Sequence, residues 1–543
     1  MPTLPPQVLP LAPAVKGNRP KSDPNVLPPA ATVLDPEVRD LKAPDPLALP
    51  VKPAQVLIQE LRPIGLQQSE NIAEVNNPEL KALASKVDQA QSALRAQISL
   101  WYPQVTLNAG SFPTQTGGQQ YSSAITGTGQ EVGDTVTRIW RMQAVLQASW
   151  SLIDPTRNPT IAAARDQFEQ AKNEYLIGLR DLRLQVAQSY FRLQFADDQV
   201  QIGQQSVRAS LVSLRDARAR FQAGVATKLE VLEAETQLAR DQQELTNSLS
   251  AQATARRSLA SILSLPQNVT PTAKDPSRVL GTWLPSLQES IVAAYAFREE
   301  LDQVLLNISI ANSNANAQLG QVQPFLKIFN NFTTARSSGS EFVNSVDPGE
   351  YGWAIDNTVG LNLTWTLFDG GNARAQYRRQ KQVADENRFR FADSRDRIRL
   401  EVETSFYQLE GNNRNIATAA REVQSSTESL RLARLRFQAG VTTQREVVNN
   451  QRDLTRAQVA YSSAISEYNV RLAELRRRTG LDQIALCQPP SLPAEKPRIE
   501  GVSDVPIEPP VLVPACKVQS GGAATIPALS LPASPGSRPA AAP

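Results

Sequence analysis

Apolar and polar residues alternate strictly in two separate stretches of the chain. In the first stretch the apolar positions are Met142, Ala144, Leu146, Ala148, Trp150 and Leu152. In the second they are Val359, Leu361, Leu363, Trp365 and Leu367. Strict alternation over this length predicts a strand with one apolar and one polar face. Partner strands are expected near residues 102–113 and 324–337, with loops rich in Gly, Ser and Thr at 114–138 and 338–356, so each stretch predicts one β-hairpin.

Alternation alone leaves two interpretations of these strands open: a soluble sheet with one buried face, or a sheet in lipid. A lone hairpin is only marginally stable in water, and it cannot cross a bilayer with open edges. Two hairpins per chain must therefore pair with other chains if they cross lipid. The sequence shows no second sheet that would cover the apolar face, which favours the membrane.

A heptad-like series of apolar residues follows the first strand pair. Its members are Phe168, Tyr175, Leu179, Leu182, Val186, Tyr190, Leu193, Val200, Val207, Leu211, Leu214 and Phe221. This pattern predicts a helix over residues 156–222, roughly 100 Å long, which must pack side by side with other helices. Gly224 is expected to end it in the left-handed conformation, and Thr227 with Glu230 forms a capping box for the next helix. The prediction is a helical hairpin with a tight, polar turn.

The same order of elements occurs twice. Residues 220–225 (Arg-Phe-Gln-Ala-Gly-Val) recur at 436–441, at an offset of 216, and the register holds on both sides. Small changes of offset within a persistent pattern indicate an old duplication of one structural unit. Copy one is placed at 66–265 and copy two at 285–480, joined by a linker at 266–284. Each copy is expected to run helix, β-hairpin, long helix, turn, helix.

Proline separates the two ends of the chain from its middle. Of 39 prolines, 15 lie in residues 1–65 and 13 in residues 483–543. Segments 1–65 and 481–543 are therefore predicted to be a Pro-rich extension and a Pro-rich tail, extended or disordered. Whether Cys487 and Cys516 in the tail form a disulfide stays open. The chain begins without a signal-peptide pattern, which fits either a cytosolic protein or a processed or trimmed start.

Composition excludes several classes of function. The chain has no His and only 2 Cys, which excludes His-based nucleophilic systems and His- or Cys₄-ligated metals. We expect no catalytic residues, no cofactor and no metal, and predict that the protein is not an enzyme. A net charge of +3 with both signs mixed gives no sign of nucleic-acid binding. No apolar run reaches the ~18 residues of a transmembrane helix.

These features resemble the TolC family of trimeric outer-membrane efflux and secretion channels over about residues 66–480. The resemblance is carried by the two Arg-Phe-Gln-Ala-Gly-Val turns, the helix starts at Glu230 and Glu446, the strand ends at Trp150 and Trp365, and the duplication. It implies a mainly α fold with a membrane β-barrel portion. Three protomers would each give four strands to a shared twelve-stranded barrel, and their long helices would form a coiled-coil barrel.

The resemblance also implies a location and a function. The protein would be a homotrimeric exit duct in the outer membrane, in contact with its lipid and extended into the periplasm, a location that favours the processed or trimmed start over a cytosolic protein. It would serve tripartite drug efflux, type I protein secretion or both, docking to a periplasmic adaptor and an inner-membrane transporter. The alternative is a soluble periplasmic coiled-coil adaptor or spacer, but an adaptor would carry one helical hairpin between lipoyl-like strands, whereas two are predicted here. The cargo stays open.

Three groups of residues are the candidate sites. The resemblance implies a cation-selecting ring at the periplasmic aperture from Glu230, Glu233 and Glu446, with Asn449 where the family often has another acid, although helix capping alone would also explain Glu230 and Glu446. The two turns are expected to dock the adaptor unless they are merely connections between helices; their residues are Gly224, Val225, Ala226, Gly440, Val441 and Thr442. An aromatic girdle in lipid is predicted from Trp140, Trp150, Trp353 and Trp365.

Overall fold

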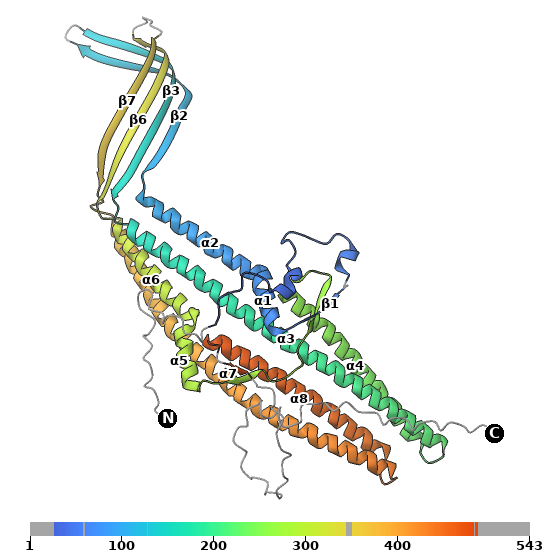
Figure 1. Cartoon of the computed structure of the whole chain (residues 1–543). Helices are drawn as coiled ribbons and strands as arrows, with labels where there is room; N and C mark the ends of the chain where they lie inside the picture. The colour runs from blue at the N-terminus through green and yellow to red at the C-terminus, as the bar shows by residue number, and fades with distance from the viewer. Residues whose placement is uncertain (1–26, 58–59, 127–128, 344–349, 483, 487–543) are drawn as a thin grey trace. The chain divides into compact units, whose positions relative to one another are not determined.

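The computed structural model describes residues 27–57, 60–126, 129–343, 350–482 and 484–486. The chain divides into two compact units. The strand unit comprises residues 85–173 and 302–391, and the helical unit comprises residues 1–84, 174–301 and 392–543. The α-helices are α1 (Leu66–Asn76), α2 (Pro78–Ile98), α3 (Arg157–Gln222), α4 (Lys228–Ile262), α5 (Leu287–Phe297), α6 (Glu299–Gly320), α7 (Asn372–Gln438) and α8 (Gln444–Thr479) (Figure 1). None of these helices in the described ranges has an apolar stretch long enough to span a bilayer.

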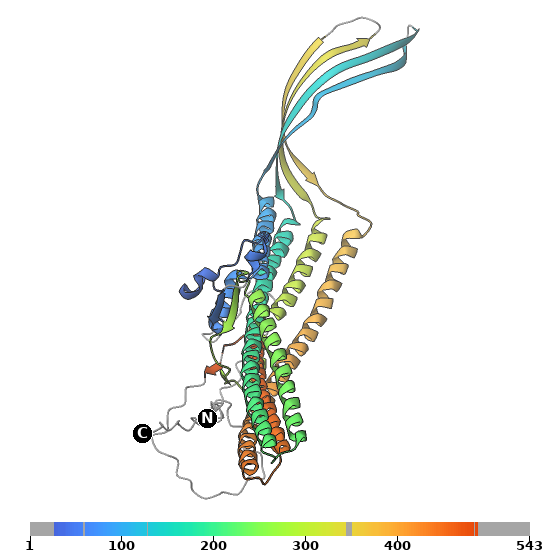
Figure 2. The same ribbon diagram turned by 90° about the vertical axis from the view of Figure 1, so that its right-hand side faces the viewer.

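The strand unit is built on one four-stranded antiparallel sheet in the order β2-β3-β6-β7 (Figures 1 and 2). Its strands are β2 (Gln104–Thr126), β3 (Gly129–Ile153), β6 (Phe325–Val343) and β7 (Glu350–Thr364). Each copy contributes one hairpin, as predicted. The loops expected at 114–138 and 338–356 are wrong, because backbone pairing continues through most of both segments. The Gly, Ser and Thr there lack apolar alternation, and that alternation reports the side-chain environment rather than the backbone hydrogen bonds.

The register of the sheet separates an apolar face from a polar one. Trp150 lies opposite Ile328, which lies opposite Leu361. The other face is mainly polar, with rows such as Gln147 opposite Asn331 and Ser151 opposite Lys327, although Phe329 opposite Ser149 also lies on it. The apolar side chains are solvent-exposed in the single chain; they include Val105, Leu107, Leu146, Trp150, Phe332, Val359, Leu361 and Leu363. A water-soluble protein rarely exposes such a continuous apolar face.

The helical unit contains two helical hairpins, α3 with α4 and α7 with α8. Each hairpin has a small core near its turn, and the two cores occupy equivalent positions at the offset of 216. In the first the core residues are Leu214, Ala217 and Ala234, with Val231 and Leu238 against them. In the second they are Leu430, Ala433, Val447 and Leu454, with Val423 and Phe437 against them. The duplication recognised in the sequence is thus a duplication of packing.

Among the described residues a larger core lies away from the turns, between α1, α3, α4 and the segment before β1 (Glu60–Ile64). β1 pairs in parallel with β4 (Val269–Ala273), and β5 (Gly281–Trp283) pairs with β8 (Ile484–Leu486). The buried members contributed by α3 include Leu179, Leu182, Val186, Tyr190, Phe191 and Leu193. Several of these belong to the predicted heptad series, which explains why that series is apolar.

Residues 1–65 are predicted to be extended or disordered, and disorder is wrong for the described residues 27–57 and 60–65. Leu34, Val38 and Leu41 are buried in the main core. Asn76 binds the segment through its side chain, accepting from the backbone N–H of Ala43 (3.0 Å) and donating to the carbonyl of Leu41 (2.7 Å). The prolines limit regular secondary structure here, but three apolar anchors and backbone hydrogen bonds to side chains hold the segment without it. Cys487 and Cys516 lie outside the described residues.

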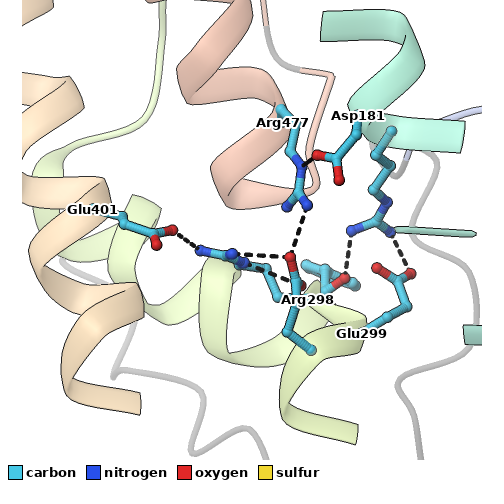
Figure 3. A network of polar contacts seen from close by, with 8 residues as sticks. Asp181, Arg298, Glu299, Glu401 and Arg477 are labelled. Carbon is cyan, nitrogen blue, oxygen red and sulfur yellow. Dashed lines mark hydrogen bonds and ion pairs between the residues drawn. The ribbon is translucent and has the colours of Figure 1, made fainter. Parts of the chain in front are cut away.

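A network of charged side chains joins four helices of the helical unit (Figure 3). Arg298, between α5 and α6, pairs with Glu300 (2.9 Å) and with Glu401 of α7 (2.6 Å). Arg477 of α8 pairs with the same Glu300 (2.8 Å) and with Asp181 of α3 (2.6 Å). Burial opposes ionisation of Glu300, yet the Arg298 hydrogen bonds and the charge of Arg477 lower its pKa to about 2. This carboxylate therefore stays ionised, and its partner Arg477 continues the network to Asp181 in copy one.

Candidate functional site

The first helical turn, residues 223–227 and called tip one from here on, follows the predicted geometry. Gly224 has φ +74°, which favours glycine because it has no Cβ. The N–H of Val225 donates to the carbonyl of Arg220 (3.0 Å), which closes the end of α3. Glu230 reaches back to accept from the N–H of Thr227 (3.4 Å). Val225 at the apex is 65% exposed.

The second turn, residues 439–443 and called tip two, has the same backbone but different polar contacts. Gly440 has φ +74° and the N–H of Val441 donates to the carbonyl of Arg436 (2.9 Å). Glu446 does not reach back to the start of α8; it accepts from Arg436 Nη1 (3.2 Å) and from the hydroxyl of Thr442. Helix capping, the alternative explanation of Glu446, is therefore wrong for this residue, because an arginine and a hydroxyl occupy its carboxylate.

Contacts between the two hairpins join the tips to each other. Arg445 at the start of α8 donates from Nε to Oε1 of Glu233 in α4 (3.1 Å), and this carboxylate also accepts from its Nη2. The side-chain amide of Gln444 donates to the hydroxyl of Ser213 in α3. The guanidinium carbon of Arg220 lies 4.4 Å from the centre of the Phe437 ring. Glu233 and Glu446 thus each form an ion pair with an arginine.

The four candidate girdle residues lie at two levels of the sheet, and all four are exposed. Trp353 shares a row with Met142, two residues from Trp140, so these two tryptophans are near the same level. Trp150 shares a row with Leu361, and Trp365 follows just after β7 ends. The structure thus places these tryptophans at two levels of the sheet with apolar side chains between them, and their role as a girdle in lipid stays a prediction.

Trp150 also has contacts with residues that lie between the sheet and the helices of the strand unit. Trp150 donates from its indole nitrogen to the carbonyl of Trp101 (3.0 Å). The guanidinium carbon of Arg157 lies 4.3 Å from the centre of the Trp101 ring, and Arg157 also donates to the carbonyl of Ser151. Both hydrogen bonds fix the orientation of rings at the end of the apolar band.

Sequence reasoning missed the residues that connect the hairpins: Arg445, Gln444, Ser213 and Arg220. Their positions follow no apolar periodicity, and pairing between segments more than 200 residues apart leaves no local signal. The duplication offered one clue, because copy two has Arg445 where copy one has Leu229. For metals, the described part of the chain contains no group of three or more Cys, Asp or Glu side chains placed to hold an ion.

A model of the outer membrane efflux protein family matches residues 71–264 and 291–481, one segment in each copy. The chain belongs to this family. The resemblance noted in the sequence is therefore confirmed, and with it an outer-membrane location and a role in efflux. The two matched segments correspond to the two copies of the duplication, and they contain both tips and the four strands of the β2-β3-β6-β7 sheet.

Individual relatives agree with this assignment. The chain is 24% identical over 341 residues to the outer membrane efflux protein BepC of Brucella suis biovar 1, covering 61% of this chain and 70% of that protein. It is 22% identical over 435 residues to the outer membrane protein TolC of Vibrio cholerae, covering 76% and 91%. The solved structure of the outer membrane protein VceC from Vibrio cholerae superposes with a TM-score of 0.60 at 14% identity, covering 77% of this chain and 96% of that one. The chain thus shares the fold of these outer-membrane proteins, with long helical hairpins and a four-stranded antiparallel sheet.

Proposed function

We propose that this efflux-family protein is a homotrimeric exit duct that performs no chemistry of its own and passes cargo delivered by a partner pump. The observation that carries the proposal is the sheet. Among the described strands, β2 and β7 are each paired on one side only, and the apolar face of the sheet is exposed. Unpaired backbone groups are very costly in lipid, so both edges require partners.

Three copies satisfy this requirement in the way that closed barrels do. β7 of one copy would pair with β2 of the next, giving a barrel of twelve strands from three sets of four. The exposed apolar face would meet lipid and the polar face would line a water-filled lumen. Trp140 with Trp353, and Trp150 with Trp365, would lie near the two membrane–water interfaces, where tryptophan is enriched. Each repeat, 66–265 or 285–480, supplies one strand hairpin and one helical hairpin.

The tips are the proposed docking points for a periplasmic adaptor and an inner-membrane transporter. Their apices carry Val225 and Val441, which are 65% and 68% exposed, and each turn ends on a threonine, Thr227 or Thr443. Gly224 and Gly440 hold these valines outward through their positive φ, with Ala226 and Thr442 next to them. A small apolar contact framed by polar groups is typical of a protein interface.

The acidic residues near the tips would line the aperture of the duct. Threefold symmetry would multiply each of Glu230, Glu233 and Glu446 and favour cations. Arg445 and Arg436 offset two of these carboxylates, so the cation preference should be moderate. Opening of the aperture would separate Arg445 from Glu233 and strengthen the negative field.

The docking proposal is tested by placing a charge at each apex. The double variant Val225→Asp with Val441→Asp should abolish efflux, while the protein remains a heat-modifiable trimer in the outer membrane. A deletion strain carrying each variant would be compared for drug susceptibility and for its secreted proteins. Leu249→Asp on the exposed side of α4, away from the tips, is the matched control. Full efflux in the double variant would contradict docking at the tips, and a monomeric native protein would contradict the duct itself.

A further inference from the structure

The two Arg-Phe-Gln-Ala-Gly-Val motifs are used in complementary ways. In copy one, Arg220 is half-buried because it stacks on Phe437, while its neighbour Phe221 is 46% exposed. In copy two Phe437 is partly covered by Arg220, whereas its neighbour Arg436 is exposed. The single chain therefore leaves one arginine and one phenylalanine of the paired motifs uncovered.

The helix faces next to these residues show the same asymmetry. Ser206 and Ser213 of α3 are covered, since they contact Thr455 and Gln444 of α8. Their equivalents on α7 at the offset of 216, Glu422 and Ser429, are exposed. The equivalents of Gln444 and Thr455 on α4, Lys228 and Ala239, are exposed as well. One face of α7 and one face of α4 thus lack the partner that their counterparts have within the chain.

We propose that these two faces meet between copies of the chain, so that Arg436 of one copy stacks on Phe221 of the next. The inference rests on the proposed homotrimer and names its contact at the tips. An offset of 216 converts Arg220 into Arg436 and Phe437 into Phe221, so the contact seen within the chain has this counterpart and no other. A duplicated chain closing into a ring alternates the two kinds of interface.

The two interfaces differ in one ion pair. Within the chain, Arg445 pairs with Glu233. The equivalents at the interface between copies are Leu229 and Asn449, which cannot form an ion pair. The exposed pair of Arg436 with Glu446 contributes little and does not prevent the guanidinium from also lying over a ring. The interface between copies therefore has the cation–π contact but no counterpart of the Arg445–Glu233 ion pair, and it should separate more readily than the interface within the chain.

Chemical cross-linking of the purified full-length protein tests this contact. In a background with Cys487→Ser and Cys516→Ser, Phe221→Cys with Arg436→Cys would be treated with a short bis-maleimide. We expect dimers and trimers on denaturing gels. The matched control, Arg220→Cys with Phe437→Cys, should react within one chain and leave the mass of a monomer. The native mass of the untreated protein is measured in parallel.

The outcomes separate the inference from the proposed function. Cross-linking within the chain by the control pair, but none between chains by Phe221→Cys with Arg436→Cys, would overturn the inference while a native trimer upholds the duct. Cross-linking of the control pair between chains would also overturn it. Should neither pair react, Phe221→Arg is the second test. Like charges at the contact should raise the mean current through the channel in a lipid bilayer. Adding Arg436→Glu should return the mean current to the wild-type value. Failure of that restoration overturns the inference too.

Discussion

The two helical hairpins share their backbone and core but not their surface. Both turns close on a glycine at φ +74°, and both cores share four equivalent positions, two of leucine, one of alanine and one of valine. The polar positions around them have diverged: Glu230 caps its helix, whereas Glu446 binds Arg436 and Thr442. Turn and core positions determine whether a hairpin forms, and the positions that have diverged determine what it contacts.

The helices that open the two copies show a second contrast. α2 follows Asn77, whose side chain accepts from the N–H of Leu80 (3.0 Å), and the next acidic residue, Glu79, is exposed. At the equivalent place in copy two, Arg298 and Glu300 enter the charged network of Figure 3. One copy therefore begins on a neutral cap and the other on partly buried ion pairs that reach α3, α7 and α8.

The largest expected effect comes from Glu300→Gln. Removing this carboxylate leaves two arginines without a shared partner, which should lower the free energy of unfolding of the helical unit by about 3 kcal/mol at neutral pH. The depressed pKa of about 2 means that its contribution is complete above the ordinary value of 4.5 and is lost as the pH falls toward 2. Denaturation followed by circular dichroism at several pH values measures this. A difference from wild type that stays constant down to pH 2 would show that the carboxylate charge does not matter.

Leu454→Ala should have the next largest effect on stability. Leu238→Ala is the matched substitution at the equivalent position of the other hairpin. Leu454 is buried, so truncation should cost about 3 kcal/mol. Leu238 is only half-buried, and the same change there should cost about half as much. Hydrogen exchange of the amides in each hairpin reports the two losses separately. Equal losses would mean that the hairpins are packed equally tightly.

Asn77→Ala should have a smaller effect. It removes one cap contact and should cost about 1 kcal/mol, with no dependence on pH between 3 and 8 since the group does not titrate. The pH dependence of the stability loss should therefore distinguish Asn77→Ala from Glu300→Gln, and the same denaturation series measures both variants. A pH-dependent loss in Asn77→Ala would indicate that the start of α2 also depends on nearby charges.

Glu446→Gln should change stability least, by under about 0.5 kcal/mol, because its ion pair with Arg436 is exposed. Its effect should appear in ion selectivity instead, as a reduced preference for cations in reversal-potential measurements. Glu79→Gln, an exposed acid on α2, is the control and should leave selectivity unchanged. If Glu446→Gln kept the ion selectivity of the wild type, the placement of Glu446 at the aperture would be contradicted.

Local signals in the sequence predicted the local structure well. Gly224 and Gly440 mark the turns because few residues accept a positive φ, and the apolar series of α3 marks its buried face. The repeated hexapeptide revealed the duplication, and alternation revealed one strand hairpin in each copy. These features depend on residues close together in the chain, so their spacing is sufficient.

Contacts between distant segments could not be predicted in this way. Leu34, Val38 and Leu41 are spaced irregularly among prolines, and only the core they enter shows their purpose. Arg445 and Glu233 appear in the sequence as ordinary charged positions, and their pairing depends on how two hairpins pack. Backbone pairing of β2 with β3 beyond residue 113 proceeds without any apolar pattern.

Single-channel recording in planar lipid bilayers tests the exit duct most directly. Purified trimer should give discrete current steps, and Arg445→Gln should enlarge or prolong them, because the ion pair with Glu233 restrains the tips. Arg414→Gln, on an exposed i,i+4 pair of α7, is the control and should behave as wild type. A folded, membrane-inserted trimer that gives no discrete current steps, with or without Arg445→Gln, would contradict a duct through this protein.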